Sequence, residues 1–229
     1  MQKLTVDNTF WSIFPQAKIY TLVVNDLNNH IPDNANKYQI MLNQAETEAK
    51  QYLTAKEFKD NSVINEWREV LSKFKKKKGA RSSIEALLKR VSQGKTFNPI
   101  NPLVDIYNSV SLEYAVPCGG EDLDQIAGQM HLGVATGNED FYPLGAEKSD
   151  PPRAGEVIYY DGSGAVCRSL NWRDGKRTML TEDTTNAILI MEAVTDDQKE
   201  RADQAIQALQ RKVADELGVV GEISIKTKN

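Results

Sequence analysis

One carboxylate in this chain lies on an apolar, strand-like segment where it could act as a base. Glu192 follows Ile188 and Ile190 at every second position of the segment 187–193, and side chains two apart in a strand share one face. A carboxylate beside an apolar wall tends to have a raised pKa, which suits it to general-base catalysis. The alternative interpretation is that Glu192 ends the strand and faces solvent.

Two further segments carry groups suited to binding a polar substrate. The run Cys118-Gly119-Gly120-Glu121-Asp122 contains adjacent glycines, which let backbone N–H groups approach an anion or oxyanion closely. Asn171, Arg173 and Asp174 form a polar cluster after a predicted hairpin strand, where the rims of pockets are common. An ordinary turn and a structural pair of Arg173 with Asp174 are the alternative interpretations.

Other familiar catalytic arrangements are absent from the sequence. It has no Gly-x-Ser-x-Gly nucleophile elbow, and His30 and His131 lack the serine or cysteine context of a triad. Cys118 is a candidate nucleophile, but a lone cysteine without a paired histidine usually just packs. Neither Cys118 nor Cys167 has a CxxC partner, so we expect reduced thiols, no metal and no cofactor.

A dense basic segment interrupts an otherwise acidic chain. The formal net charge is -4, yet the segment 75–81 holds several cations: Lys75, Lys76, Lys77, Lys78 and Arg81. A lysine that neutralises a phosphate releases counterions, so this segment predicts contact with RNA. The alternative interpretation is a solvated charged face.

The elements that position these residues follow a pattern of mixed helices and strands. Apolar periodicity and capping signals predict helices over 40–53, 63–74, 82–94, 101–110 and 195–218. Alternation and turn residues predict strands over 19–24, 130–134, 156–160, 165–169, 187–193 and 219–225. The clearest hairpin joins 156–160 to 165–169 through Asp161-Gly162-Ser163-Gly164.

Size and composition favour one packed domain. The chain has 229 residues, of which 40% are hydrophobic and 26% charged, as in an ordinary globular protein. We therefore predict an α/β (α+β) fold in which residues 1–229 form a single mixed-sheet domain with flanking helices. No stretch is apolar enough to cross a membrane and the start lacks a signal-peptide layout, so we expect a cytosolic protein without a membrane partner.

The middle of the chain resembles a known family. The segment from Asn101 to Glu113, followed by Pro117 and then Asp122-Leu123-Asp124, is similar in order and spacing to the tRNA-editing domain of the phenylalanyl-tRNA synthetase beta subunit. The segments 82–94, 152–161 and 186–193 resemble further parts of that domain. The resemblance covers about residues 80–194. The N-terminal extension 1–79 and the C-terminal helix and strand in 195–229 are then elaborations.

The resemblance implies an activity and a set of roles. The expected activity is hydrolysis, by an activated water, of the ester of a mischarged tRNA in trans. Glu192 matches the strand-end glutamate of the family, and Asn108 lies on the matched helix, where it could hold the substrate's α-amino group or a water. Mischarged tRNA is then the expected partner of the segment 75–81. The alternative is a non-catalytic module that binds an amino acid or tRNA.

The departures from the family fall at the expected site and bear on specificity. Tyr107 stands where the family has threonine, Gly119 where it has histidine and Glu121 where it has an aromatic residue, and the segment 171–175 replaces a glycine-rich turn. We expect all of these to line a reshaped substrate pocket. A Tyr107 ring in the wall would leave little room for a second ring, so a substrate other than tyrosine, with a small or branched side chain, is predicted.

Overall fold

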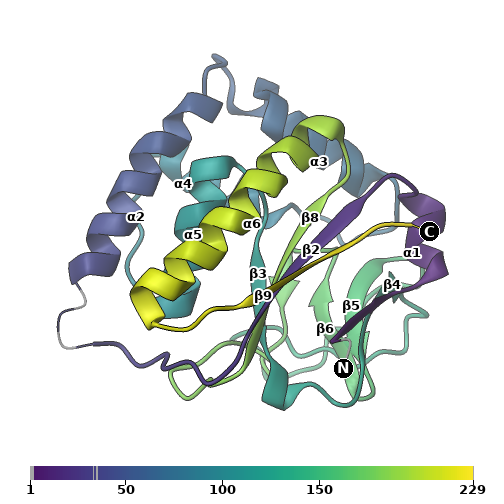
Figure 1. Ribbon diagram of the computed structural model, residues 1–229. Coiled ribbons are helices and arrows are strands. Elements are labelled where there is room, and N and C mark those ends of the chain that lie inside the picture. Colours follow the sequence, from purple (N-terminus) through teal and green to yellow (C-terminus); the bar gives the residue numbers. More distant parts are fainter. Residues whose placement is uncertain (1–2, 33, 35, 229) are drawn as a thin grey trace.

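The computed structural model, which describes residues 3–32, 34 and 36–228, contains a run of helices from α2 to α5 followed by a run of strands from β3 to β8 (Figure 1). The α-helices of these residues are α1 (Asn8–Ile13), α2 (Asn36–Ala49), α3 (Ser62–Ser72), α4 (Ser83–Ser92), α5 (Pro102–Tyr114) and α6 (Asp196–Leu217). The strands are β1 (Leu4–Val6), β2 (Lys18–Val24), β3 (Gly119–Asp122), β4 (Met130–Val134), β5 (Val157–Asp161), β6 (Gly164–Arg168), β7 (Arg173–Asp174), β8 (Ala187–Ala193) and β9 (Glu222–Lys226).

The strands form two sheets. The central sheet has the order β3-β8-β2-β9 and is antiparallel throughout. The second sheet, which we call the hairpin sheet, has the order β1-β4-β5-β6-β7, and only its β1–β4 pair is parallel. The predicted α/β class is confirmed, with the strands divided between two sheets instead of gathered in one.

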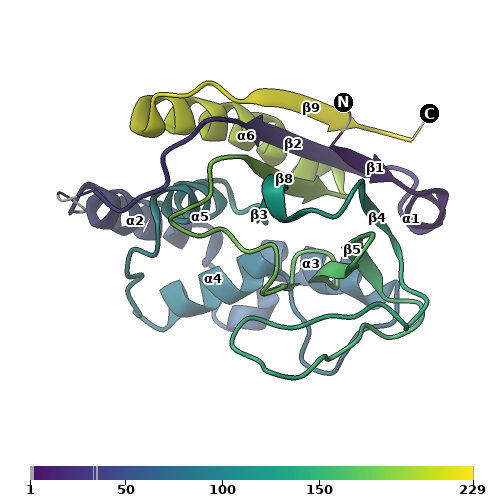
Figure 2. The same cartoon turned by 90° about the horizontal axis from the view of Figure 1, so that it is seen from below.

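Strand β8 of the central sheet is buried on both faces, whereas the edge strand β9 is largely exposed. Leu22, Leu189 and Met191 share one apolar cluster with side chains of α5 and α6. Ile188 and Ile190 point the other way and pack with the hairpin sheet and with α1, α3 and α4. Figure 2 shows the two layers, with β2 and β9 at the top and α3, α4 and β5 below. A strand buried on both faces explains why β8 is nearly continuous in apolar residues.

Most of the elements lie where the sequence predicts them, because their ends carry explicit signals. Ser82 accepts a hydrogen bond from the backbone N–H of Glu85, and Asn101 accepts one from Val104. Thr195 and Gln198 form a complete capping box at the start of α6. Each side chain satisfies a backbone donor that would otherwise lack a partner at a helix start.

Several elements were not predicted. The glycine run 119–122, for which the sequence left an anion-binding segment and an ordinary turn open, is strand β3 paired with β8, and β1, α1 and the short β7 had no clear periodicity to reveal them. Residues 18–24, which belong to the expected extension, form a central strand between β8 and β9. Within the described residues, no helix combines the length and apolar character needed to span a membrane.

Candidate functional site: an acidic pocket between the sheets

A small cavity lies between the central and hairpin sheets. Its volume is about 20 Å³, enough for one group the size of a water molecule. The lining residues come from five strands and one turn: Gly119, Gly120, Glu121, Tyr159, Cys167, Leu170, Asn171, Asp174, Ile190 and Glu192. Three of them are carboxylic acids. We call this cavity the acidic pocket.

Glu192 is fixed in this pocket by two hydrogen bonds. Its side chain is only 1% exposed, on a strand that pairs with β2 on one side and β3 on the other. The Tyr159 hydroxyl donates to Oε1 at 2.7 Å and the Asn171 amide donates to Oε2 at 2.7 Å. The alternative interpretation of Glu192 as a solvent-facing strand end is therefore wrong, because Tyr159 and Asn171 cover the carboxyl group on the side of the hairpin sheet.

The surroundings of Glu192 bring its titration into the neutral range. Burial raises the pKa of Glu192 from 4.5 to about 7, and the hydrogen bonds from Tyr159 and Asn171 oppose this rise because they favour the ionised form. Near neutral pH the carboxyl group can therefore both take up and release a proton. This is the property required of a general base.

A turn with unusual backbone angles holds Asn171 against Glu192. Ser169 and Leu170 have φ values of 49° and 64°, in the left-handed region that residues with side chains rarely adopt. The backbone N–H of Leu170 donates to Val157 O at 3.0 Å, and the Ser169 hydroxyl donates to Glu156 at 2.8 Å. Strain of this kind persists only where the surroundings enforce it, and it gathers at functional sites.

Asn171 also connects the pocket to α4. Its Oδ1 accepts a hydrogen bond from the backbone N–H of Ser83 at 3.1 Å while its Nδ2 donates to Glu192. Ser83 is the first residue of α4 and closely follows the basic segment 75–81. The basic segment therefore ends beside the acidic pocket, two residues before a group that contacts Asn171.

The other two acids of the pocket differ in exposure. Glu121 is 4% exposed and Asp174 is half-buried. Burial first, and then the charge of Asp174, raises the pKa of Glu121 well above its usual range. Burial raises the pKa of Asp174 as well. Among the described residues no cluster of His, Cys, Asp or Glu has the arrangement of a metal site.

Fewer backbone N–H groups of the two β3 glycines are available to bind an anion than the sequence suggested. Gly119 pairs with Ile190 and Gly120 with Leu189, and successive N–H groups of a strand point to opposite edges. The N–H of Asp122 donates to Thr178 O on the outer edge, so Gly120 faces that edge and Gly119 faces β8. A Cβ atom at Gly120 would lie 2.6 Å from the Leu189 side chain, which explains why this position has no side chain.

Four of the predicted catalytic and substrate-binding residues do not line the pocket: Tyr107, Asn108, Cys118 and Arg173. Tyr107 and Asn108 are half-buried on α5, and Tyr107 packs with the cluster on the opposite face of the central sheet. Cys118 belongs to the same cluster, and burial raises the pKa of its thiol well above the usual range, which disfavours the nucleophilic thiolate. The expected wall of Tyr107 is therefore not part of this cavity, because β3 separates the two.

Arg173 and the basic segment lie outside the pocket. Arg173 is exposed, with its guanidinium 5.1 Å from the Trp172 ring centre, since neighbouring side chains of a strand point to opposite faces. Lys77 forms an ion pair with Asp150 at 2.5 Å, and Lys76 donates to Leu71 O. The remaining cations of the segment are exposed: Lys75, Lys78 and Arg81.

Neither histidine belongs to the pocket. His30 is exposed, 3.7 Å from Glu182. His131 bonds to Asp7 at 2.9 Å and stacks on Tyr160. Tyr159, which donates to Glu192, was not among the predicted site residues, because nothing in the sequence distinguishes it from the adjacent Tyr160.

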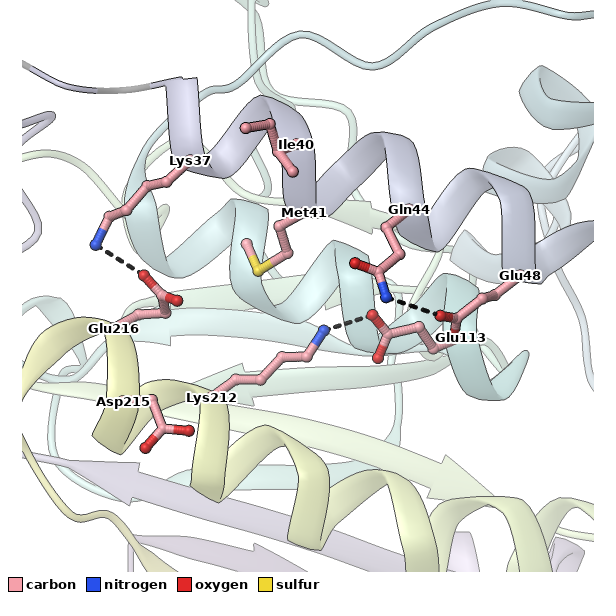
Figure 3. A pocket seen from close by; sticks show the side chains of 9 residues that line it. All are labelled: Lys37, Ile40, Met41, Gln44, Glu48, Glu113, Lys212, Asp215 and Glu216. Atoms are coloured by element: carbon pink, nitrogen blue, oxygen red, sulfur yellow. Dashed lines mark hydrogen bonds and ion pairs between the residues drawn. The ribbon is translucent and has the colours of Figure 1, made fainter.

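A larger surface groove between α2, α5 and α6 has a different character. Its volume is about 380 Å³, and Figure 3 shows how the charges around it pair with one another. Lys37 contacts Glu216 at 2.7 Å, and Lys212 forms an ion pair with Glu113. These pairs compensate their own charges, whereas the acids of the acidic pocket have no such partner.

The chain has a buried acidic pocket between two sheets, and its sequence matches that of a known family. The profile of the B3/4 domain family matches residues 66–214, which is more than half of the chain. The chain belongs to the B3/4 domain family. No curated protein matches the sequence.

Among solved structures, the chain is similar to an N-terminal fragment of the phenylalanyl-tRNA synthetase beta subunit from Pyrococcus horikoshii. The TM-score is 0.52 at 14% sequence identity, and the match covers 96% of this chain and 50% of that one. The chain thus spans about half the length of the fragment, and at this identity the likeness concerns the fold alone. The resemblance to the synthetase beta subunit predicted from the sequence is confirmed.

Proposed function

We propose that this protein is an aminoacyl-tRNA deacylase that hydrolyses the ester of mischarged tRNA in trans. Membership of the B3/4 domain family and the fold shared with a synthetase beta-subunit fragment support a tRNA-related role. The observation that carries the proposal is Glu192, a buried carboxyl with a pKa of about 7 beside a small cavity. Ester hydrolysis needs a base of this kind to activate water.

The proposed reaction uses groups that already touch one another. Glu192 takes a proton from a water molecule, and the water oxygen attacks the carbonyl carbon of the ester. Asn171 has a second amide hydrogen with which it can stabilise the developing oxyanion. When the ester bond breaks, the tRNA 3′ oxygen takes the proton from Glu192, and the amino acid leaves as the free acid.

The basic segment 75–81 is the proposed contact for the tRNA backbone. It ends next to α4, whose first N–H bonds to Asn171 in the pocket, so phosphates bound here would lie near the reacting ester. Lys75, Lys78 and Arg81 are the exposed cations of this segment. Lys76 and Lys77 are engaged within the protein and contribute less.

One observation favours the alternative of a binding module without catalysis. Both oxygens of Glu192 already accept hydrogen bonds from protein groups. A carboxyl held in this way could bind an amino acid without activating water. Catalysis and binding must therefore be measured separately.

The first prediction tests hydrolysis on a panel of radiolabelled mischarged tRNAs. At least one ester should decay faster with the protein than without it. Glu192→Gln, which keeps the shape of the side chain but cannot accept a proton, should slow that decay by roughly 100-fold. Glu200→Gln, an exposed change on α6, is the matched control and should leave the rate unchanged.

Two results would contradict the proposal. Decay of the whole panel at the spontaneous rate, with tRNA or amino acid still bound, would identify a binding module. An unchanged rate in a folded Glu192→Gln variant would remove Glu192 from the mechanism.

A further inference from the structure

Glu121 has a buried oxygen without a partner. It lines the acidic pocket and is 4% exposed, yet its Oε2 has no hydrogen-bond partner among the described residues. The Thr178 hydroxyl lies near this carboxyl, but neither of the two buried atoms makes a well-formed hydrogen bond. A buried carboxyl oxygen left unpaired is unfavourable, so the pocket lacks one donor.

The nearby cations are engaged with other acids. Arg168 binds Glu156 through two nitrogens at 3.0 and 2.8 Å, and Arg177 binds Asp161 at 2.9 and 2.7 Å. Of these two, Arg177 is the one that affects Glu121, through its charge at a distance. No hydrogen bond or ion pair joins a described cationic side chain to any of the three acids of the pocket.

We propose that the acidic pocket takes the side-chain ammonium of a basic aminoacyl group, with Glu121 as the residue that determines this specificity. The substrate class is then an aminoacyl ester with a second amino group, as in lysine or a shorter diamino acid. The inference rests on the proposed function, because it names the substrate of the same site.

Size and charge favour an ammonium over other donors. The cavity of about 20 Å³ accommodates one small polar group, so the pocket must widen on binding to take the rest of the side chain and to bring the ester to Glu192. A hydroxyl would supply a hydrogen bond but no charge, whereas an ammonium compensates a buried carboxylate directly.

The α-ammonium, which every aminoacyl ester has, does not account for the whole cluster. Glu192 is already hydrogen-bonded by two protein donors, and Asp174 has the Cys167 thiol as a side-chain partner. Glu121 is the enclosed acid that remains without a donor. A second positive charge on the ligand satisfies it.

The second prediction compares two ligands that differ only in the charged end of the side chain. The probes are adenosines carrying lysine or norleucine through a non-hydrolysable 3′-amide, with binding measured by calorimetry at pH 7.5. The lysyl probe should bind at least about tenfold more tightly. In Glu121→Gln the two probes should bind within about twofold of each other, because the neutral side chain cannot pair with the ammonium. Glu200→Gln should keep the preference.

The results separate this inference from the proposed function. Equal binding of the two probes, tighter binding of norleucine, binding of neither, or a lysine preference unchanged in Glu121→Gln would each overturn it. The comparison in the unmodified protein holds even if the variant fails to fold. Selective lysyl binding without hydrolysis of lysyl-tRNA would support the pocket and contradict the deacylase, whereas hydrolysis of neutral esters with unselective binding would do the reverse. Free lysine, measured alongside, shows whether the nucleoside is needed.

Discussion

The Tyr159 hydroxyl and the Asn171 amide act on Glu192 in the same direction. Both donate to its oxygens, so both favour the ionised carboxylate, while the apolar wall of Ile188 and Ile190 favours the neutral acid. Burial is the larger effect, and the resulting pKa is about 7. A site that lacked either donor would hold Glu192 protonated to a higher pH, where it could not accept a proton from water.

The third prediction concerns the pH dependence of hydrolysis. If ionised Glu192 is the base, kcat/KM should rise tenfold per pH unit below about pH 7 and level off above it. In Tyr159→Phe the inflection should move to higher pH, because a donor that favours the carboxylate is gone. The rate defect should therefore be largest at low pH and vanish at high pH.

The titratable groups that face Glu192 bear on how this pH profile is interpreted. They are Tyr159 of β5, Asp174 of β7 and the thiol of Cys167, and each has a raised pKa. A profile that falls with rising pH, or a Tyr159→Phe defect that is the same at every pH, would contradict the assignment. A structural defect would lower the rate without moving the inflection.

At the scale of elements, the sequence predicts the strand that carries the base better than the pocket around it. The alternation of Ile188, Ile190 and Glu192 places all three on one face whatever else the chain does. Asn171 was also identified, because polar residues after a hairpin strand commonly lie at a pocket. Its contact with Ser83 was not foreseen, since the two are far apart in sequence and meet only through tertiary packing.

The remaining errors have local causes. Tyr159 and Tyr160 are adjacent and the pairing of β5 with β6 shifts register between them, so alternation alone cannot tell which ring faces inward. The glycine run was expected to present backbone N–H groups or to form a turn, because glycine favours both, but it pairs with the buried strand β8 instead. Tyr107 was expected in the pocket because the resemblance placed it at a site position of the family, and the sequence does not reveal that β3 lies between Tyr107 and the cavity.

The basic segment 75–81 divides into cations that are engaged and cations that are exposed, and the fourth prediction depends on this. Neutralising Lys75, Lys78 and Arg81 together should flatten the slope of log affinity for tRNA against log salt by up to about 0.7–0.9 for each phosphate that is no longer neutralised. Neutralising the exposed lysines Lys50, Lys56 and Lys59 changes the net charge equally and should leave the slope nearly unchanged.

Lys77→Gln provides a further comparison within the same segment. Lys77 pairs with Asp150, which also lies 3.2 Å from buried Arg168, so this variant should mainly lower thermal stability. If the triple variant kept the slope of the unmodified protein, the segment would be a solvated face with no role in tRNA binding.

At the scale of the whole molecule, the ionisation of the acidic pocket opposes the stability of the folded protein. Folding buries Glu192 and Glu121, and each has a higher pKa in the folded protein than in the unfolded chain. The folded state therefore holds more protons than the unfolded state above pH 4.5, and its stability falls as the pH rises. The ionised form that the proposed hydrolysis needs is thus the less stable one.

Other acidic groups add to this loss of stability with rising pH or oppose it. Burial raises the pKa of Asp105 to about 6, even though its carboxylate accepts hydrogen bonds from the Ile100 N–H. Asp150 acts in the opposite direction, because the bond from Lys77 lowers its pKa. The contribution of Asp150 is lost only in strongly acidic solution, so above pH 4.5 the raised groups determine the sign.

The last prediction isolates Glu192 within that balance by comparing melting temperatures at pH 5 and pH 8. The unmodified protein should lose stability between these values, because Glu192 ionises through about pH 7 in the folded state and near 4.5 in the unfolded chain. Glu192→Gln removes this ionisation, so its melting temperature should fall less between the two pH values. At pH 8 its free energy of unfolding should exceed that of the unmodified protein by on the order of 2 kcal/mol, and each kcal/mol raises the melting temperature by about 2–4 °C. Glu200→Gln should follow the unmodified protein at both pH values.

A Glu192→Gln variant with the same pH dependence as the unmodified protein would mean that Glu192 titrates as an ordinary carboxyl. A variant that gains stability at pH 8 while losing hydrolysis would show that this buried acid is retained at the expense of the fold.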